Sequence, residues 1–158
     1  MTLVPLPVAK MHIRAEDAAD DEVTPYLSAA ELAAASLLNR QVYATQGELD
    51  AAVAGVPAML TAAGVAHTAA VEAAEALEDA IARATGVAYA DTVYARAQDE
   101  AREIRAGMVV NDAVKAAIVL LFGHLHANRE DAVTGGTVAQ MPMGSQYLLM
   151  PYRVGLGV

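Results

Sequence analysis

Three acidic side chains, Glu72, Glu75 and Asp79, follow one another at helical spacing in a stretch of the chain that is rich in alanine. Residues three or four positions apart share one face of a helix, and paired carboxylates serve as general acid and general base in many hydrolases. Such a pair needs a cleft that separates the two pKa values, and a stretch with few bulky residues builds a cleft poorly. The pattern therefore favours a solvated acidic stripe. A small acidic helical hydrolase that uses Glu72, Glu75 and a histidine is the alternative.

Two histidines, His124 and His126, could suggest a metal site. On a helix, two positions correspond to about 200° of rotation, so one of them is expected to pack and the other to face a neighbour. No Glu-x-x-His pattern supplies further ligands, and the chain contains no cysteine. Ser28, Ser36 and Ser145 lack the Gly-x-Ser-x-Gly setting of a serine nucleophile. We therefore expect no metal, no cofactor and no enzymatic activity.

The composition predicts a helical protein. The chain has 158 residues, a length typical of one domain. Hydrophobic residues make up 56% of the chain but aromatic residues only 4%, and alanine supplies much of the difference. Alanine is the best helix former and is depleted in strands, which predicts a mainly α fold. The formal charge of −9 disfavours a surface that grips nucleic acid.

Neither a membrane span nor an export signal is expected. The longest strongly apolar run, residues 116–123, falls well below the roughly twenty residues that a bilayer requires. The first ten residues include Pro5 and Pro7 and lack the apolar segment of a signal peptide. We expect a chain that is made in the cytoplasm and is not exported.

Two helices carry the strongest apolar periodicity. A helix over residues 21–42, capped by Asp20 or Asp21, has one stripe that is expected to be buried. The members of this stripe are Tyr26, Leu27, Ala30, Ala34, Leu37 and Leu38. A second helix, capped by Asn111 or Asp112, is apolar around most of its circumference and is expected to be the central core helix. Its row consists of Val110, Val114, Ile118, Leu121 and Leu125, interleaved with Ala117 and Leu120.

The middle of the chain predicts thinner contacts. We expect three helices here, over residues 45–54, 65–84 and 90–106. Gly55 and Pro57 should stop the first of them, because proline and glycine are the residues least compatible with a helix interior. Gly86 should separate the other two. Apart from a few large apolar residues, the middle stretch is alanine and glutamate, which suits a narrow contact face.

The last 22 residues, 137–158, contain several prolines and glycines, so only one short helix near residues 145–150 has room to form. A segment this apolar and irregular cannot form its own core and needs a surface to lie on. We expect a small helical bundle, residues 1–136, followed by an irregular, extended C-terminal arm, residues 137–158. Residues 45–107 are a possible insertion in the bundle. Removal of the arm from Pro142 onward is expected to leave the fold intact.

Two motifs near the C-terminus resemble a known family. The first is Gly123-His124-Leu125-His126-Ala127-Asn128-Arg129-Glu130, which follows the aliphatic helix. The second is Met141-Pro142-Met143-Gly144 with Leu148-Leu149-Met150-Pro151-Tyr152-Arg153-Val154. In order and spacing these motifs resemble the head-tail connector (adaptor) proteins of long-tailed double-stranded DNA bacteriophages. The resemblance is close over residues 109–158, looser over residues 8–43, and does not clearly cover residues 45–107.

The resemblance implies a structural virion protein. Proteins of this family form a ring, commonly of twelve copies, between the portal protein and the tail, where they extend the DNA channel. A tail-side stopper or tail terminator protein docks on the ring, and genomic double-stranded DNA passes through it without specific binding. The implied location is the neck of the virion, after assembly in the host cytoplasm. A free-standing regulatory module that binds a protein partner remains a further alternative.

The resemblance also indicates residues for contact with the portal or with a neighbouring subunit. These are Asn128, Arg129, Glu130, Tyr147, Leu148, Leu149, Pro151, Tyr152 and Arg153. The acidic residues Glu72, Glu75 and Asp79 are candidates for facing the DNA channel, because a wall of like charge repels phosphate.

Overall fold

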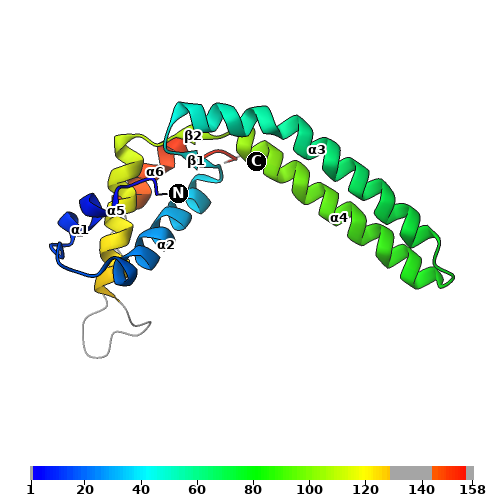
Figure 1. Ribbon diagram of the computed structural model, residues 1–158, viewed down its shortest axis with the longest axis horizontal. Coiled ribbons are helices and arrows are strands. Elements are labelled where there is room, and N and C mark those ends of the chain that lie inside the picture. The colour runs from blue at the N-terminus through cyan, green and yellow to red at the C-terminus, as the bar shows by residue number, and fades with distance from the viewer. Residues whose placement is uncertain (1, 129–143, 156–158) are drawn as a thin grey trace. The chain divides into compact units, whose positions relative to one another are not determined.

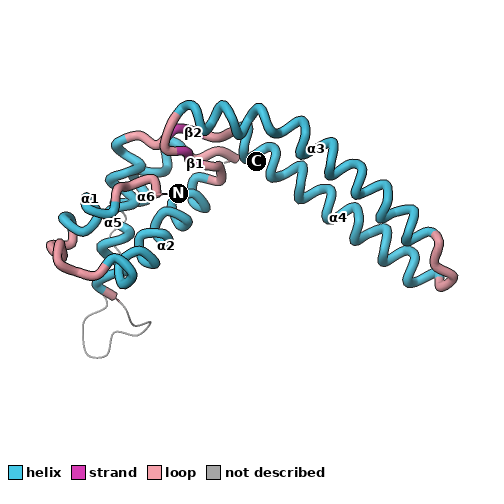
Figure 2. The backbone as a smooth tube through the Cα atoms, viewed as in Figure 1, coloured by secondary structure: helices cyan, strands magenta, loops and turns pink. Residues whose placement is uncertain are grey.

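The computed structural model describes residues 2–128 and 144–155. It is 77% helical, with one minor sheet of two strands, which confirms the predicted mainly α fold. Its internal contacts divide the chain into two compact units. Unit 1 comprises residues 1–45 and 108–158, and unit 2 comprises residues 46–107. Figures 1 and 2 show the elements of each unit.

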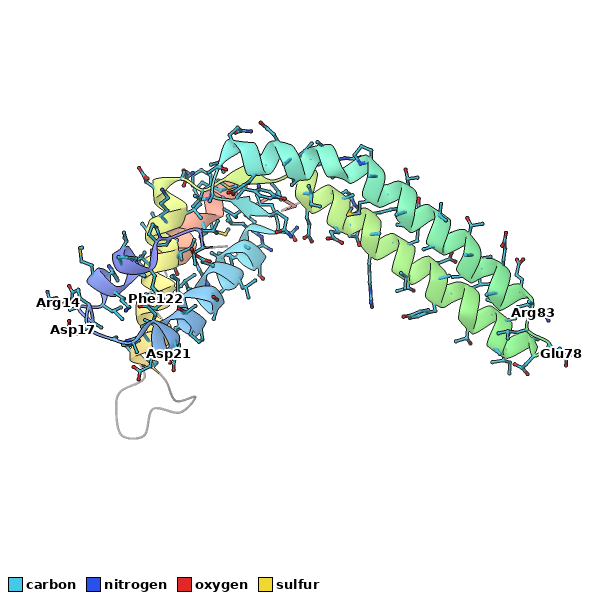
Figure 3. All side chains as sticks on the ribbon, viewed as in Figure 1. Arg14, Asp17, Asp21, Glu78, Arg83 and Phe122 are labelled. Atoms are coloured by element: carbon cyan, nitrogen blue, oxygen red, sulfur yellow. The ribbon has the colours of Figure 1, made fainter. Side chains whose placement is uncertain are left out.

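Unit 1 is a bundle centred on two helices, α2 (Asp20–Leu38) and α5 (Asp112–Ala127). A short helix, α1 (Leu6–His12), packs on both of them. Phe122, which Figure 3 labels on α5, is the largest fully buried side chain of the described residues. The core formed by these helices includes Val23, Leu27, Ala30, Ala34, Leu38, Val114, Ala117, Ile118 and Phe122.

The predicted core helix is therefore confirmed, with one change of detail. Ile118 is fully buried, whereas Leu121 packs against the core only partly buried. Leu120 is 44% exposed, so α5 keeps an open apolar side. Asn111 caps the helix through its side-chain oxygen, which accepts a hydrogen bond from the Val114 amide at 2.9 Å.

Helix α2 ends earlier than the predicted residue 42. It stops at Leu38 because Asn39 adopts the left-handed conformation, with φ of 54°. The chain then forms β1 (Val42–Tyr43), which pairs in parallel with β2 (Met108–Val109). The two strands lie where the chain leaves unit 1 and returns to it. A strand of two residues gives no periodic signal, so the sequence did not predict this pairing.

Unit 2 is an antiparallel pair of long helices, α3 (Gln46–Glu75) and α4 (Ala80–Arg105). The predicted breaks are wrong, because Gly55 and Pro57 lie inside α3 and Gly86 lies inside α4. In a helix interior a glycine costs about 1 kcal/mol and a proline about 3 kcal/mol; the surrounding good helix formers and the packing of α3 on α4 offset these costs. The turn instead falls between Glu75 and Ala80, where Figure 3 labels the nearby Glu78 and Arg83.

The described part of the C-terminal arm lies against the bundle. It forms α6 (Gly144–Leu149) and a 3-10 turn, η1 (Met150–Tyr152), and α6 packs on α5. Leu149 is 1% exposed and belongs to the core. The Val154 amide then donates to the Leu38 carbonyl at 3.0 Å. Residues 144–155 therefore pack within unit 1, whereas the sequence predicted an arm that could be removed from Pro142 onward with the fold left intact.

Candidate functional site

The three acidic residues of the sequence analysis do not share one helical face. Glu72 and Glu75 lie in the last turn of α3, but Asp79 is the N-cap of α4. Its carboxylate accepts a hydrogen bond from the Ala82 amide at 2.6 Å, which satisfies one of the free amides at the helix start. All three side chains are exposed. The predicted single stripe is therefore wrong, because the turn between the helices separates Asp79 from the other two.

The two histidines of α5 point in different directions, as predicted. The ring of His126 packs edge-on against Tyr26, with centroids 6.0 Å apart, and lies 6.1 Å from the ring of Phe122. His124 instead lies beside Asn128, whose amide nitrogen is 3.2 Å from His124 Nδ1. Asn128 also donates from its side chain to the His124 carbonyl at 2.9 Å and so closes the helix. Among residues 2–128 and 144–155, no three metal-ligating side chains gather at one place.

The residues of the C-terminal motifs that were predicted to contact a partner differ in their burial. Tyr147 is 73% exposed, and Pro151 and Arg153 are also exposed. Leu149 is fully buried, so its predicted contact with a partner is wrong. Leu148 and Tyr152 pack, partly buried, on the core. Arg129 and Glu130 lie outside the residues that the structure describes.

The Tyr152 backbone also anchors the end of the chain. Its carbonyl accepts a hydrogen bond from Arg40 Nη1 at 3.3 Å, and the Val154 carbonyl accepts one from Asn39 Nδ2 at 3.4 Å. Both donors follow the end of α2. The second half of the motif is thus held in place by residues more than a hundred positions earlier in the chain. Such contacts leave no local pattern from which the sequence could have revealed them.

A buried carboxylate, Glu31, holds the beginning of the chain. Its Oε1 accepts hydrogen bonds from the Leu3 amide at 2.6 Å and from the Val4 amide at 3.0 Å. These bonds place the Val4 side chain in the core, where it is 1% exposed. Because buried charges require partners, the two amides explain why a glutamate is tolerated on the inner face of α2.

An apolar groove of about 580 Å³ lies between the first residues and α5 in unit 1. Val4, Val8, Val119 and Leu120 line its walls, and Lys115 stands beside them. Val8 and Leu120 are both substantially exposed. His12 also lines the groove, whose walls are otherwise mostly apolar, as is usual for pockets that bind small molecules.

Unit 2 contains one polar link that the sequence analysis missed. His67 Nε2 on α3 lies 2.7 Å from Asp91 Oδ1 on α4, and the His67 ring lies 5.0 Å from the ring of Tyr94. The two partners are 24 positions apart. Only the register of the two helices reveals the pair.

Comparison of the chain with family models, with curated proteins and with solved structures finds no match. The assignment of a function therefore rests on the chain's own residues.

Proposed function

We propose that the chain is a head-tail connector subunit, which forms a ring of about twelve copies between a bacteriophage portal and its tail. The observation that carries this proposal is the pair of C-terminal motifs, which appear in the order and spacing of that family. The ring extends the DNA channel, binds the portal on one side and offers the tail-side stopper or tail terminator a platform on the other. Its location is the virion neck.

The roles of the described motif residues support this proposal. Asn128 closes α5, and Leu149 fills the core between α5 and α2. The described parts of the two motifs thus lie on α5 and on the segment that begins with α6, and α5 and α6 pack on each other in unit 1. Leu149 of the second motif supports the fold from within the core, while other members of that motif remain exposed and available for docking.

Tyr147 is the strongest candidate for contact with the portal. It is a large aromatic side chain, it is 73% exposed, and it lies on a helix that the core holds in place. Exposed aromatic residues on a rigid support are typical anchors of protein interfaces. Pro151 and Arg153 follow it on the exposed side of the chain end.

The charge of the chain supports a passive role toward DNA. At −9 per subunit, a ring of such chains repels phosphate, so DNA can slide through the channel without being held. Glu72 and Glu75 are exposed candidates for the channel wall, and Asp79 beside them also caps a helix.

The proposal is tested with DNA-filled, portal-bearing heads from the phage that encodes the chain. The purified full-length chain is mixed with these heads, bound chain is quantified after gradient sedimentation, and the necks are inspected by electron microscopy. We expect saturable binding at one vertex, and a loss of affinity of about tenfold or more in Tyr147→Ala. Gln146→Ala, at an exposed position of the same helix, is the matched control and should bind normally. Absence of binding by the unaltered chain would overturn the proposal.

A further inference from the structure

The groove between the first residues and α5 carries a cation without an ion-pair partner among the described residues. The chain contains only two lysines. Lys10 is buried, and its ammonium group is bound by the Asp20 carboxylate and the Ala18 carbonyl. Lys115 lines the groove, and no ion pair joins it even to Asp112, one turn earlier on α5. No acidic side chain of the described residues lines the groove, so Lys115 is available to a carboxylate from outside.

The walls beside Lys115 are apolar and only partly covered. Val8 is 51% exposed and Leu120 is 44% exposed. A Cβ added to Gly123 would lie 3.6 Å from two atoms of the His12 ring, so this ring packs against α5 at the groove. The groove, of about 580 Å³, falls in the range of roughly 300–1,000 Å³ that is typical of binding pockets. It therefore suits an occupant that combines apolar side chains with a carboxylate.

The turn between α3 and α4 presents both of these features in its residues 77–81, the hairpin tip. Ile81 is 78% exposed, more than any other large apolar side chain of the described residues, and Leu77 is 44% exposed. Between them lie Glu78 and Asp79. Asp79 is engaged as the N-cap of α4. Within the described residues Glu78 makes no ion pair, not even with Arg83 at the same end of the hairpin (Figure 3).

The end of the hairpin is acidic in spite of Arg83. Residues 72–83 carry a net charge of −3, from one guanidinium and the four carboxylates of Glu72, Glu75, Glu78 and Asp79. Two copies with a formal charge of −9 each repel one another at long range, so a contact between them is favoured where opposite charges meet locally. The acidic hairpin tip and the groove beside Lys115 meet this condition, and their apolar side chains are then covered together.

We infer that the hairpin tip of one copy docks in the groove of unit 1 of a second copy. Leu77 and Ile81 pack on the apolar walls of the groove. Glu78 approaches Lys115. Tip and groove are different surfaces, so the contact is head-to-tail and closes into a ring when the rotation allows it. Each copy in a closed ring is held by two such contacts, which strengthens a small interface. The contact joins neighbouring subunits of the proposed ring, and in that respect the inference rests on the proposed function.

A lipid bilayer is a poorer partner for the hairpin tip. Within the described part of the chain, α3 alone is long and apolar enough to cross a membrane by length and composition, which is weak support for a span. Helix α4 is packed along it and carries exposed Arg83, Asp91 and Arg96. Insertion of the hairpin would take these charges into the hydrocarbon, which is unfavourable. The groove of a second copy covers the tip without that penalty.

The first test places a carboxylate on either side of the contact. Sedimentation velocity of the full chain is measured over a wide concentration range for the unaltered protein, for Ile81→Glu in the tip and for Val8→Glu in the groove. We expect concentration-dependent assembly beyond the dimer, and a loss of self-affinity of about tenfold or more in each variant. Leu32→Glu is the matched control, because Leu32 is 70% exposed on α2 and lies outside both surfaces, and it should assemble normally. Unaltered protein that stays monomeric, or either variant that assembles as well as its parent, would overturn the inference.

The second test mixes the two variants. Ile81→Glu keeps an intact groove and Val8→Glu keeps an intact tip, so an equimolar mixture should form one-to-one heterodimers and nothing larger. Two identical surfaces packed on each other, or a tip docked within its own chain, would not give this pattern. A mixture without heterodimers would contradict the inference.

The third test exchanges the charges. Glu78→Lys and Lys115→Glu should each weaken assembly, and the two together in one chain should restore it. Failure of the double variant to recover would refute the pairing on which the inference depends. Monomers that float with phosphatidylcholine vesicles, and lose this binding in Ile81→Glu, would assign the tip to a membrane and also overturn the inference.

The inference and the proposed function can fail separately. Tip-dependent assembly of a chain that does not bind heads would remove the proposed function and leave the inference standing. Binding to heads without tip-dependent assembly would remove the inference alone.

Discussion

Replacement of Gly86 by alanine tests the close packing of α3 and α4. The glycine lies inside α4, and the added Cβ would lie 2.8 Å from the Cβ and 3.6 Å from the Cα of Ala74. Neither atom belongs to a flexible side chain that could move aside, so one helix must shift. Gly64 in α3 is the matched control, since a Cβ added there meets nothing within 4 Å.

Two opposing effects determine the result. In both helices the change from glycine to alanine favours the helical backbone by about 1 kcal/mol. At Gly86 this gain competes with overpacking, which typically costs about 1–3 kcal/mol. We therefore expect Gly64→Ala to stabilise unit 2 by up to about 1 kcal/mol, and Gly86→Ala to be neutral or to destabilise it by up to about 2 kcal/mol.

Native-state hydrogen exchange of the full chain, read by mass spectrometry on peptides from α3 and α4, measures these changes within unit 2. The double variant Ala74→Gly with Gly86→Ala removes the clash, so the two substitutions should show favourable coupling of about 1 kcal/mol or more. If Gly86→Ala stabilised the helices as much as Gly64→Ala does, the close approach of α3 and α4 would be refuted.

Four further outcomes are expected. Phe122→Ala should lower the free energy of unfolding of unit 1 by about 3–5 kcal/mol in chemical denaturation, because it empties a fully buried site. Leu149→Ala should cost about 2–5 kcal/mol in the same assay because Leu149 belongs to the core, and a change below about 0.5 kcal/mol would contradict that placement. Asp79→Ala should cost about 0.5–2 kcal/mol of local stability at the start of α4, measured by hydrogen exchange. Burial raises the pKa of the Tyr43 phenol above its usual 10.0 and so favours the neutral form in the folded state. The free energy of unfolding should therefore fall as the pH rises above 10. Tyr43→Phe should remove this part of the pH dependence.

The core helix could be predicted because its burial comes from large side chains. Val114 and Ile118 belong to a helix that is apolar around most of its circumference, which is typical of a core helix, and both are buried. Phe122 continues the same face and was missed, because the apolar residues beside it satisfy the same periodic pattern. Leu120 is nevertheless exposed, because apolar character around a helix predicts burial only where a neighbouring element covers that side.

The middle helices were divided wrongly for an energetic reason. Gly55 and Pro57 disfavour a helix locally, yet α3 continues through both of them. Helix formation sums small contributions over many residues, and the long alanine-rich surroundings outweigh two unfavourable positions. The actual turn has its own signal, because Asp79 is a good N-cap residue placed three positions before the amide that it binds.

Only part of the candidate site could be predicted from the sequence. The motif directed attention to residues 147–153, but it could not separate the exposed Tyr147 from the buried Leu149. That distinction depends on how α6 packs on α5. The pair formed by His67 and Asp91 likewise depends on the register of two helices. Contacts of this kind become visible only after the elements have been placed.

Native mass spectrometry of the full-length chain mixed with isolated portal rings tests the central claim most directly. The proposed function predicts one dominant complex in which a single portal ring carries about twelve copies of the 16.4 kDa chain, with few partly filled rings because neighbouring copies bind cooperatively. Portal rings that carry no copies, or that carry a few copies in a random distribution at saturating concentration, would contradict it.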